Sequence, residues 1–335
     1  MELQSVLVVG GGIGGLTAAI ALRRKGFPVT IVEKDPEWSV YGVGIIQQFN
    51  VIRAMWALDL LDDYLEKAFG FDRTVLHVGP QGQQVANFET PRLAGAAYPS
   101  NAGIRRTDLQ KVLGDRVQAL GATIRLGTTV TAMQDDGAGV TVTLSDGTTE
   151  RHDIVIGADG VFSQTRAQIL PDAPQPCYTG QWVWRYNLPQ PADMDGIQVF
   201  VGPQNAGFVP LGQGQMYMFL LSQEAPGLAL PQEGAAEAMR ARIGPMAPPQ
   251  VRAVTDQITD DAGVVARPLE VVFVEGAWHK GRVVLLGDAL HASTPHLAQG
   301  AGMAIEDGLV LAEELARAAP PTLPLPPIAP AVLRG

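Results

Sequence analysis

Cysteine and basic charge are scarce in this sequence of 335 residues, and each shortage excludes a class of site. Cys177 is the single cysteine, so an internal disulfide and metal sites built on paired cysteines are excluded. Lys and Arg number 24 against 34 Asp and Glu, which gives a formal net charge of −10. No basic cluster is present, and the electrostatic footprint of a nucleic-acid-binding protein is therefore missing. We expect no metal site and no nucleic-acid partner.

Long apolar runs are missing as well. The first apolar stretch, residues 6–9, is far shorter than the roughly 20 residues that a membrane-spanning helix needs. Glu2 precedes it, where a secretory signal peptide would carry positive charge. We therefore expect no membrane association and a protein of the reducing cytoplasm.

Glycine, by contrast, is abundant, with 38 residues, and the first of these lie in an ordered pattern. Residues 5–9 are a continuous apolar run rich in β-branched side chains, which is typical of a buried parallel strand. Residues 16–25 follow a helical pattern that Gly26 closes, and residues 29–32 predict a second strand. The chain is therefore predicted to begin with a βαβ unit.

The loop Gly10-x-Gly12-x-x-Gly15 joins the first strand to the helix with the spacing of a dinucleotide-binding turn. Gly10 permits the tight turn, Gly12 lets the backbone approach a pyrophosphate, and Gly15 lets the helix pack close to the strand. The N-terminus of the helix offers unpaired N–H groups to the phosphates. Glu33, at the end of the second strand, is placed to bind an unphosphorylated ribose. The loop alone leaves FAD and NAD both open.

The middle of the chain contains two kinds of predicted secondary structure. Residues 50–67 and 108–120 predict helices, and residues 73–88 predict a hairpin. Residues 178–274 read as alternating strands with one helix and no phosphate loop. We therefore predict an α/β fold in which a β-rich substrate layer is inserted into a Rossmann-like nucleotide-binding domain.

Two later motifs place an acid at the end of an apolar strand. Asp159-Gly160 is the first, although Asp-Gly is also ordinary turn chemistry. Asp288 is the second, and a carboxylate at such a strand end suits the hydroxyls of a ribityl chain. Gly300 and Gly302 then open a helix whose N-terminus would stabilise negative charge on a reduced flavin ring.

The three motifs, in this order, resemble the class A flavoprotein monooxygenases of the para-hydroxybenzoate hydroxylase type. The resemblance covers about residues 6–315 and implies that the first motif holds the ADP half of FAD, with Asp288 near the ribityl chain. It implies a Rossmann-like FAD-binding domain at 1–72, 98–175 and 276–316 and an inserted β-rich substrate layer at 73–97 and 176–275. Residues 317–335 are expected to form a proline-rich tail.

The cofactor contacts follow from the same resemblance, which places an arginine before a helix and a small-residue segment beside the flavin. The residues expected to bind FAD are Gly10, Gly12, Ile13, Gly14, Gly15, Glu33, Lys34, Gly44, Ile45, Arg106, Asp159, Gly160, Asp288, Pro295, Gly300, Ala301, Gly302 and Met303.

The reaction implied by the resemblance is hydroxylation of a small aromatic or heteroaromatic phenol. NADH or NADPH, bound transiently, reduces FAD, which reacts with O2 to give a C4a-hydroperoxide that transfers one oxygen to the ring. His296 is the favoured general base, with a purely structural role as the alternative, and Tyr217, Gln47 and Arg185 are further catalytic candidates. Tyr217 could equally be core, and Arg185 a surface ion pair. The protein is expected to be a monomer or a homodimer.

Several alternatives stay open on the sequence. Trp182-Val183-Trp184 loosely echoes the Trp-x-Trp-x-Ile-Pro segment of flavin halogenases. Epoxidation, oxidation of a polyketide-like compound, or an inactive FAD-binding relative would suit the same motifs. The proline-rich segment 317–335 departs from the family pattern, which continues with helical sequence. Six apolar residues are expected to supply a pocket wall and in part ordinary core: Trp182, Trp184, Phe208, Met216, Met218 and Phe219.

Overall fold

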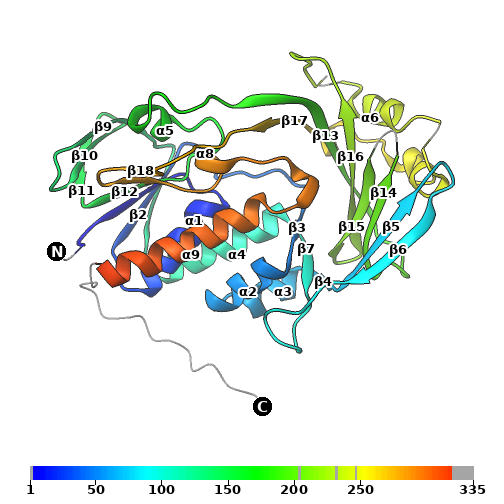
Figure 1. The fold of residues 1–335 in the computed structure, drawn as a ribbon, viewed down its shortest axis with the longest axis horizontal. Coiled ribbons are helices and arrows are strands. Elements are labelled where there is room, and N and C mark those ends of the chain that lie inside the picture. The colour runs from blue at the N-terminus through cyan, green and yellow to red at the C-terminus, as the bar shows by residue number, and fades with distance from the viewer. Residues whose placement is uncertain (1–2, 203–204, 231–232, 246, 319–335) are drawn as a thin grey trace.

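The computed structural model of the protein describes residues 3–202, 205–230, 233–245 and 247–318. Within these ranges two large β-sheets stand at opposite ends of the molecule, joined by long connecting segments and underlain by helices (Figure 1). The expected α/β fold, a Rossmann-like domain with an inserted β-rich layer, is confirmed. Most of the expected proline-rich tail lies outside the described residues.

The first large sheet has six strands in the order β18-β19-β12-β1-β2-β8. Its centre, β1 (Val6–Val9), runs parallel to β2 (Val29–Glu33) and β12 (Ile154–Gly157). Parallel strands of this kind are covered on both faces, which explains their continuous apolar sequence. The remaining strands are β8 (Thr123–Leu126), β18 (His279–Lys280) and β19 (Val283–Leu285).

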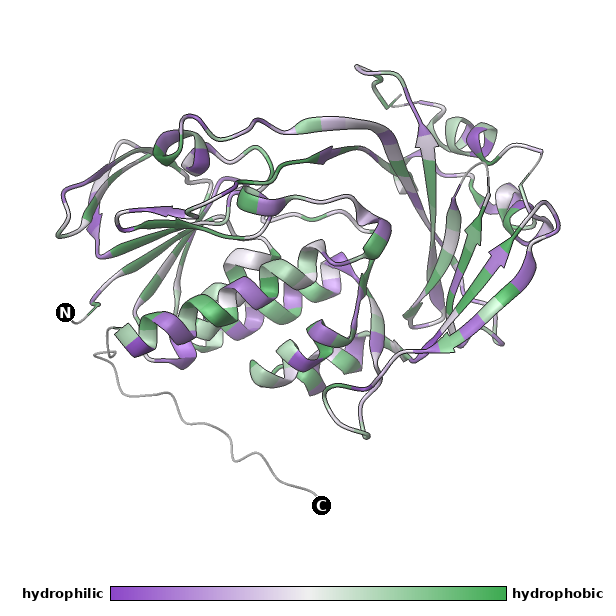
Figure 2. Cartoon of the chain, viewed as in Figure 1, coloured by the Kyte–Doolittle hydropathy of each residue, from purple (hydrophilic) through white to green (hydrophobic). Residues whose placement is uncertain are grey.

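Alternate residues of β1 face different layers, as the two-residue period of a strand requires. Val6 and Val8 pack against helices, while Leu7 and Val9 pack against a small antiparallel sheet. Figure 2 shows these central strands as apolar and the long helices as striped. The covering elements are helices α1 (Ile13–Arg24), α4 (Arg106–Ala119) and α9 (Gly300–Ala318), and strands β9 (Val130–Asp135), β10 (Val140–Leu144) and β11 (Thr149–His152).

The second large sheet has seven strands in the order β17-β13-β16-β15-β14-β5-β6. Neighbours are antiparallel except β14 and β5, which run parallel. The strands are β5 (Arg73–Val78), β6 (Gln83–Glu89), β13 (Cys177–Pro189), β14 (Gly196–Val201), β15 (Ala206–Gly212), β16 (Gln215–Gln223) and β17 (Val265–Val271).

Smaller elements connect the two sheets. A three-stranded sheet in the order β3-β7-β4 lies between them, and α6 covers the outer face of the seven-stranded sheet (Figure 1). The bounds are β3 (Gly44–Gln47), β4 (Phe69–Phe71), β7 (Asn101–Arg105), α2 (Phe49–Ala57), α3 (Leu61–Lys67), α5 (Gln164–Ile169), α6 (Ala235–Ile243), α7 (Pro249–Arg252) and α8 (Asp288–His291), with 3₁₀ turns η1 (Thr255–Gln257), η2 (Asp261–Gly263) and η3 (Pro295–Leu297).

Two sequence expectations need correction. The single helix predicted at 50–67 is two helices, because Asp59 adopts a left-handed φ of 58° and ends the first one. Within 178–274 the sequence indicated strands at 198–201 and 216–221, whereas β15 between them gave no such signal, because its glycines and Pro210 are typical of turns. In the part of the chain that the structure describes, no helix combines the length and apolarity needed to cross a bilayer.

Candidate functional site

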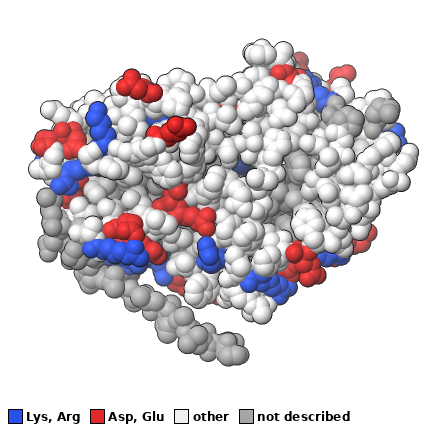
Figure 3. Space-filling model, viewed as in Figure 1, with Lys and Arg blue, Asp and Glu red and all other residues white. Residues whose placement is uncertain are grey.

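A cavity of about 1060 Å³ lies between the carboxyl ends of the parallel strands and the inner face of the seven-stranded sheet. Figure 3 shows a hollow in a largely uncharged part of the surface, with a basic side chain deep inside it. Ligands of open α/β sheets bind at this edge. Pockets for one small molecule measure roughly 300–1,000 Å³, so the cavity is large enough for a cofactor with a second ligand beside it.

The three spaced glycines of the N-terminal loop have different surroundings in the structure. Gly10 has a φ of +111°, and a Cβ on it would lie 2.4 Å from the carbonyl oxygen of Ala158. A Cβ on Gly15 would lie 2.0 Å from the carbonyl oxygen of Gly10. A Cβ on Gly12 would meet nothing within 4 Å, because this residue faces the cavity at the N-terminus of α1. The open space at Gly12 fits the pyrophosphate of a dinucleotide.

Glu33 reaches back from the end of β2 to this loop. Its Oε2 accepts the N–H of Gly11 at 2.7 Å, and its Oε1 accepts the N–H of Asp35 at 2.9 Å. The carbonyl of Gly11 in turn accepts bonds from Trp38 Nε1 at 2.8 Å and Gln110 Nε2 at 3.0 Å. Trp38 and Gln110 were missed on the sequence, since no local pattern marks a side chain that bonds a distant backbone. Together these groups fix the conformation of the loop.

The Gly287-Asp288 turn is held by helix α9. Gly287 has a φ of +59°, and its N–H donates to Asp307 Oδ2 at 2.8 Å. The same carboxylate oxygen bonds His291 Nε2 at 2.7 Å, which raises the pKa of His291. Asp307 therefore positions the turn from which Asp288 faces the cavity.

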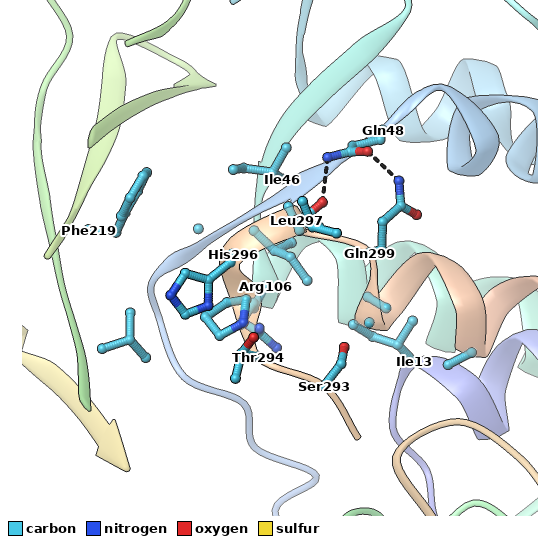
Figure 4. A pocket seen from close by; sticks show the side chains of 18 of the residues that line it. Ile13, Ile46, Gln48, Arg106, Phe219, Ser293, Thr294, His296, Leu297 and Gln299 are labelled. Atoms are coloured by element: carbon cyan, nitrogen blue, oxygen red, sulfur yellow. Dashed lines mark hydrogen bonds between the residues drawn. The ribbon is translucent and has the colours of Figure 1, made fainter. Parts of the chain in front are cut away.

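The segment that follows, including His296, is tied to β3 and α2 by side-chain amides (Figure 4). Gln48 Nε2 donates to the carbonyl of Leu297 at 2.7 Å, and Gln299 Nε2 donates to Gln48 Oε1. Asn50 Nδ2 donates to Gln299 Oε1 at 3.1 Å. His296 is exposed and projects toward the sheet that carries Phe219. This amide network fixes one wall of the cavity.

Two arginines face the cavity without a matching acid. Neither Arg106, at the start of α4, nor Arg185, on β13, forms a hydrogen bond or ion pair through its side chain with any described residue. Enclosure, together with the charge of Arg185, lowers the pKa of Arg106 to about 10. Enclosure raises the pKa of Tyr217 to about 12 and also raises the pKa of Asp288. With Arg267, three arginines line the cavity against two acids, Asp288 and Glu270, and this excess of positive charge suits anionic groups on a ligand.

Fourteen of the residues predicted for the site line this cavity. They come from seven separate stretches of chain, which the fold brings together. They are Gly12, Ile13, Gly14, Gly44, Ile45, Arg106, Gly160, Arg185, Tyr217, Asp288, Pro295, His296, Gly300 and Ala301.

The other predicted residues lie behind the lining or away from it. Gln47 is fully buried, and its amide has no hydrogen-bond partner among the described atoms. Asp159 bonds Ser163 Oγ and the N–H of Thr165, so it holds the start of α5. The remainder support the loop, extend into solvent or lie within helix α9: Gly10, Gly15, Glu33, Lys34, Gly302 and Met303.

The expected pocket wall is largely wrong. Of its six residues, Phe219 alone lines the cavity within the described chain. The other five, which include both tryptophans, pack with α6 on the opposite face of the sheet. Trp184 Nε1 donates to Ser222 Oγ there, so the halogenase-like tryptophan pair has no counterpart at the cavity. The described residues also contain no group of three or more His, Cys, Asp or Glu that could hold a metal ion.

Comparison with known proteins agrees with this geometry. A family described as FAD binding domain matches residues 4–320. The 3-hydroxybenzoate 6-hydroxylase of Polaromonas naphthalenivorans (strain CJ2) is 34% identical over 326 residues, covering 92% of this chain and 78% of that protein. The aurachin C monooxygenase/isomerase of Stigmatella aurantiaca is 32% identical over 316 residues, covering 92% and 79%.

A solved structure extends the comparison to the cofactor. Klebsiella pneumoniae HpxO, complexed with FAD and uric acid, superposes with a TM-score of 0.81 at 26% identity, covering 92% of this chain and 79% of that one. The cradle at Gly12 and the arginines at the cavity fit the same cofactor. The chain therefore belongs to the FAD binding domain family and is a flavoprotein monooxygenase of the class A aromatic hydroxylase type.

Proposed function

We propose that the protein uses NADH or NADPH and O2 to hydroxylate a small phenol-type aromatic or heteroaromatic substrate. The carrying observation is that the unpaired guanidinium of Arg185 lies in the same cavity as the FAD-binding loop, on a sheet face otherwise rich in apolar side chains. A largely apolar wall with an unpaired cation suits an aromatic ring that bears an acidic group. Relatives named for 3-hydroxybenzoate and uric acid support a substrate of this kind.

FAD, when bound, supplies the electron transfer from the nicotinamide and the activation of O2. Gly12 and the N-terminus of α1 would hold its pyrophosphate, and Asp288 its ribityl hydroxyls. The protein itself orients the substrate and keeps water away from the ring. We further propose that it works as a monomer or a homodimer and binds the nicotinamide only transiently.

Three side chains have separate tasks in this proposal. Arg185 binds the acidic group of the substrate and sets the position of its ring. Tyr217 remains a neutral hydrogen-bond donor, because its raised pKa of about 12 keeps the phenol protonated at neutral pH. An imidazole nitrogen of His296 accepts the proton of the substrate hydroxyl. Gln47 has no task, since it lies outside the cavity lining.

The test is consumption of NADH and NADPH by the FAD-loaded protein against a panel of phenols, hydroxybenzoates and hydroxypyridines. We expect one group of compounds to stimulate consumption and to gain one oxygen atom, detected by mass spectrometry. Consumption that no ring compound stimulates, or stimulation without an oxygenated product for any member, would contradict the proposal.

Arg185→Met gives a sharper version of the same test. Loss of a hydrogen bond to a charged group costs roughly 1.5–3 kcal/mol, so we expect kcat/KM for an acidic substrate to fall about 10- to 100-fold. Arg185→Lys should retain part of the rate. Arg53→Met, at an exposed arginine on α2, is the control. An unchanged kcat/KM in Arg185→Met would remove this residue from the substrate site.

A further inference from the structure

The inner face of the seven-stranded sheet changes chemistry from one side to the other. Strand register places Arg185 of β13 beside Phe219 of β16, Phe219 beside Gly207 of β15, and Gly207 beside Val199 of β14. Three strand spacings separate the ends of this row, which is about 14 Å. The row therefore extends past the width of a single aromatic ring.

Phe219 forms the centre of the row because Gly207 leaves space for it. A Cβ on Gly207 would lie 2.5 Å from the ring of Phe219, so the ring lies against the bare backbone of β15. The same ring lines the cavity. An aromatic surface in this position offers stacking or edge contacts to a substrate ring that Arg185 holds from one side.

Beyond Phe219 the cavity wall carries no charge. The lining residues on β14, β5 and β6 are Ile197, Val199, Val201, Thr74 and Phe88, and none of these described side chains is ionisable. The charged lining residues of the sheet, by contrast, lie on β13 and β17. The wall is thus polar on the side of Arg185 and apolar on the side of β14.

The apolar side also opens outward. Ile197 is 8% exposed, whereas Val201 on the same strand is 44% exposed and Phe88 is 51% exposed. Single exposed apolar residues are ordinary on protein surfaces. Val201 and Phe88 differ from that case, because both line a cavity that continues inward to Phe219. The surface around the hollow in Figure 3 is likewise mostly uncharged.

We propose that this wall is a subsite for an unbranched aliphatic chain carried by the aromatic substrate on the side opposite its acidic group. The chain runs from Val199 past Ile197 of β14 and Thr74 of β5, and its end reaches the surface beside Phe88 of β6, which strand register places next to Thr74. This inference rests on the proposed function, and it narrows the substrate class to amphipathic alkyl-substituted phenols and their heteroaromatic counterparts.

The test uses the FAD-loaded protein and para-n-alkylphenols from methylphenol to octylphenol. Dissociation constants come from calorimetric titration, and kcat/KM comes from product formation. Burial of each methylene is worth roughly a three- to fourfold gain in affinity, so we expect binding to tighten stepwise until the chain reaches solvent. Phe88→Ser should flatten this dependence. Val85→Ser is the matched control, since Val85 is 54% exposed on the same strand as Phe88 but outside the cavity.

Each outcome decides one of the two proposals. Affinity that rises with chain length, and loses this dependence in Phe88→Ser but not in Val85→Ser, supports the subsite even if no oxygenated product forms. Hydroxylation of short and long phenols with equal affinity overturns the subsite and leaves the proposed function standing. Chain-length dependence that both variants retain also overturns it, because the chain would then bind elsewhere.

Discussion

Gly12 and Gly15 lie three residues apart in one loop, yet each is a glycine for a different structural reason. Gly15 has no room for a side chain, because the carbonyl of Gly10 occupies that place. Gly12 has room, and the φ of −82° there is open to any residue. Gly15 is therefore required for folding, whereas Gly12 leaves free the space that the cofactor requires.

Gly12→Val should accordingly fold but lose FAD. We expect its apo-protein melting temperature to match that of the apo wild type, while the flavin absorbance of the purified protein disappears. Gly15→Val is the contrasting variant, and its backbone clash should lower stability as well as flavin content. Retention of FAD by Gly12→Val would refute the assignment of this loop to the pyrophosphate.

Tyr217→Phe separates a hydrogen-bond donor from a base. The pKa of Tyr217 lies near 12, so its hydroxyl keeps its proton throughout the pH range of activity. We expect the variant to lose roughly tenfold in kcat/KM, through one lost hydrogen bond, with the pH profile unmoved. His296→Gln should instead remove the proposed base and lower kcat. A displaced profile in Tyr217→Phe would make the tyrosine the titrating group.

At the scale of single elements, helix α9 holds the Gly287-Asp288 turn of the site in position. Asp307 on this helix accepts bonds from both Gly287 and His291, and it raises the pKa of the histidine. A group whose pKa is higher in the folded than in the unfolded protein stabilises the fold fully below its unfolded value, near 6.5 for histidine. That contribution is lost as the pH rises through the higher, folded value.

Asp307→Asn tests this linkage, because asparagine keeps an acceptor for Gly287 but removes the charge. The melting temperature of the variant should fall further below wild type at about pH 6 than at about pH 9. Glu313→Gln, an exposed position on the same helix, is the control and should show no such trend. An equal deficit at both pH values would mean that the pair acts without charge.

Elements with local signals could be predicted from the sequence, whereas strand faces could not. The βαβ unit and its glycine loop were predicted because turn chemistry and periodicity are local properties. The tryptophans of β13 were misplaced because alternation tells which residues share a face but not which face meets the cavity. Val183 and Arg185 face the cavity, whereas Trp182 and Trp184, which alternate with them along β13, do not. Trp38, Gln110 and Asp307 escaped prediction because each acts on backbone groups distant in sequence.

Over the whole molecule, the cavity joins two sheets that contribute different tasks. The six-stranded sheet and its loops supply the surfaces for FAD, and the seven-stranded sheet supplies the opposite wall. A ligand that contacts both walls favours the folded state over the unfolded one.

FAD should therefore raise the melting temperature of the apo protein in a concentration-dependent way. At a hundredfold excess over Kd the added stability is about 2.7 kcal/mol, which corresponds to roughly 4 °C for a chain of 335 residues. FMN, which lacks the ADP half, should give a smaller shift, and Gly12→Val should give none with FAD. Equal shifts from FMN and FAD would show that the N-terminal loop does not hold the nucleotide.

The six-stranded sheet is assembled from three distant stretches of chain, and its pairing of β12 with β19 joins residues near 155 to residues near 283. β19 and α9 follow β17 along the chain, so they leave the ribosome after the seven-stranded sheet. The nascent chain thus waits with an unpaired edge on β12, which is a hazard for aggregation. We therefore expect FAD to bind only after β19 has paired with β12, and the yield of active enzyme to depend on protection of the β12 edge until then.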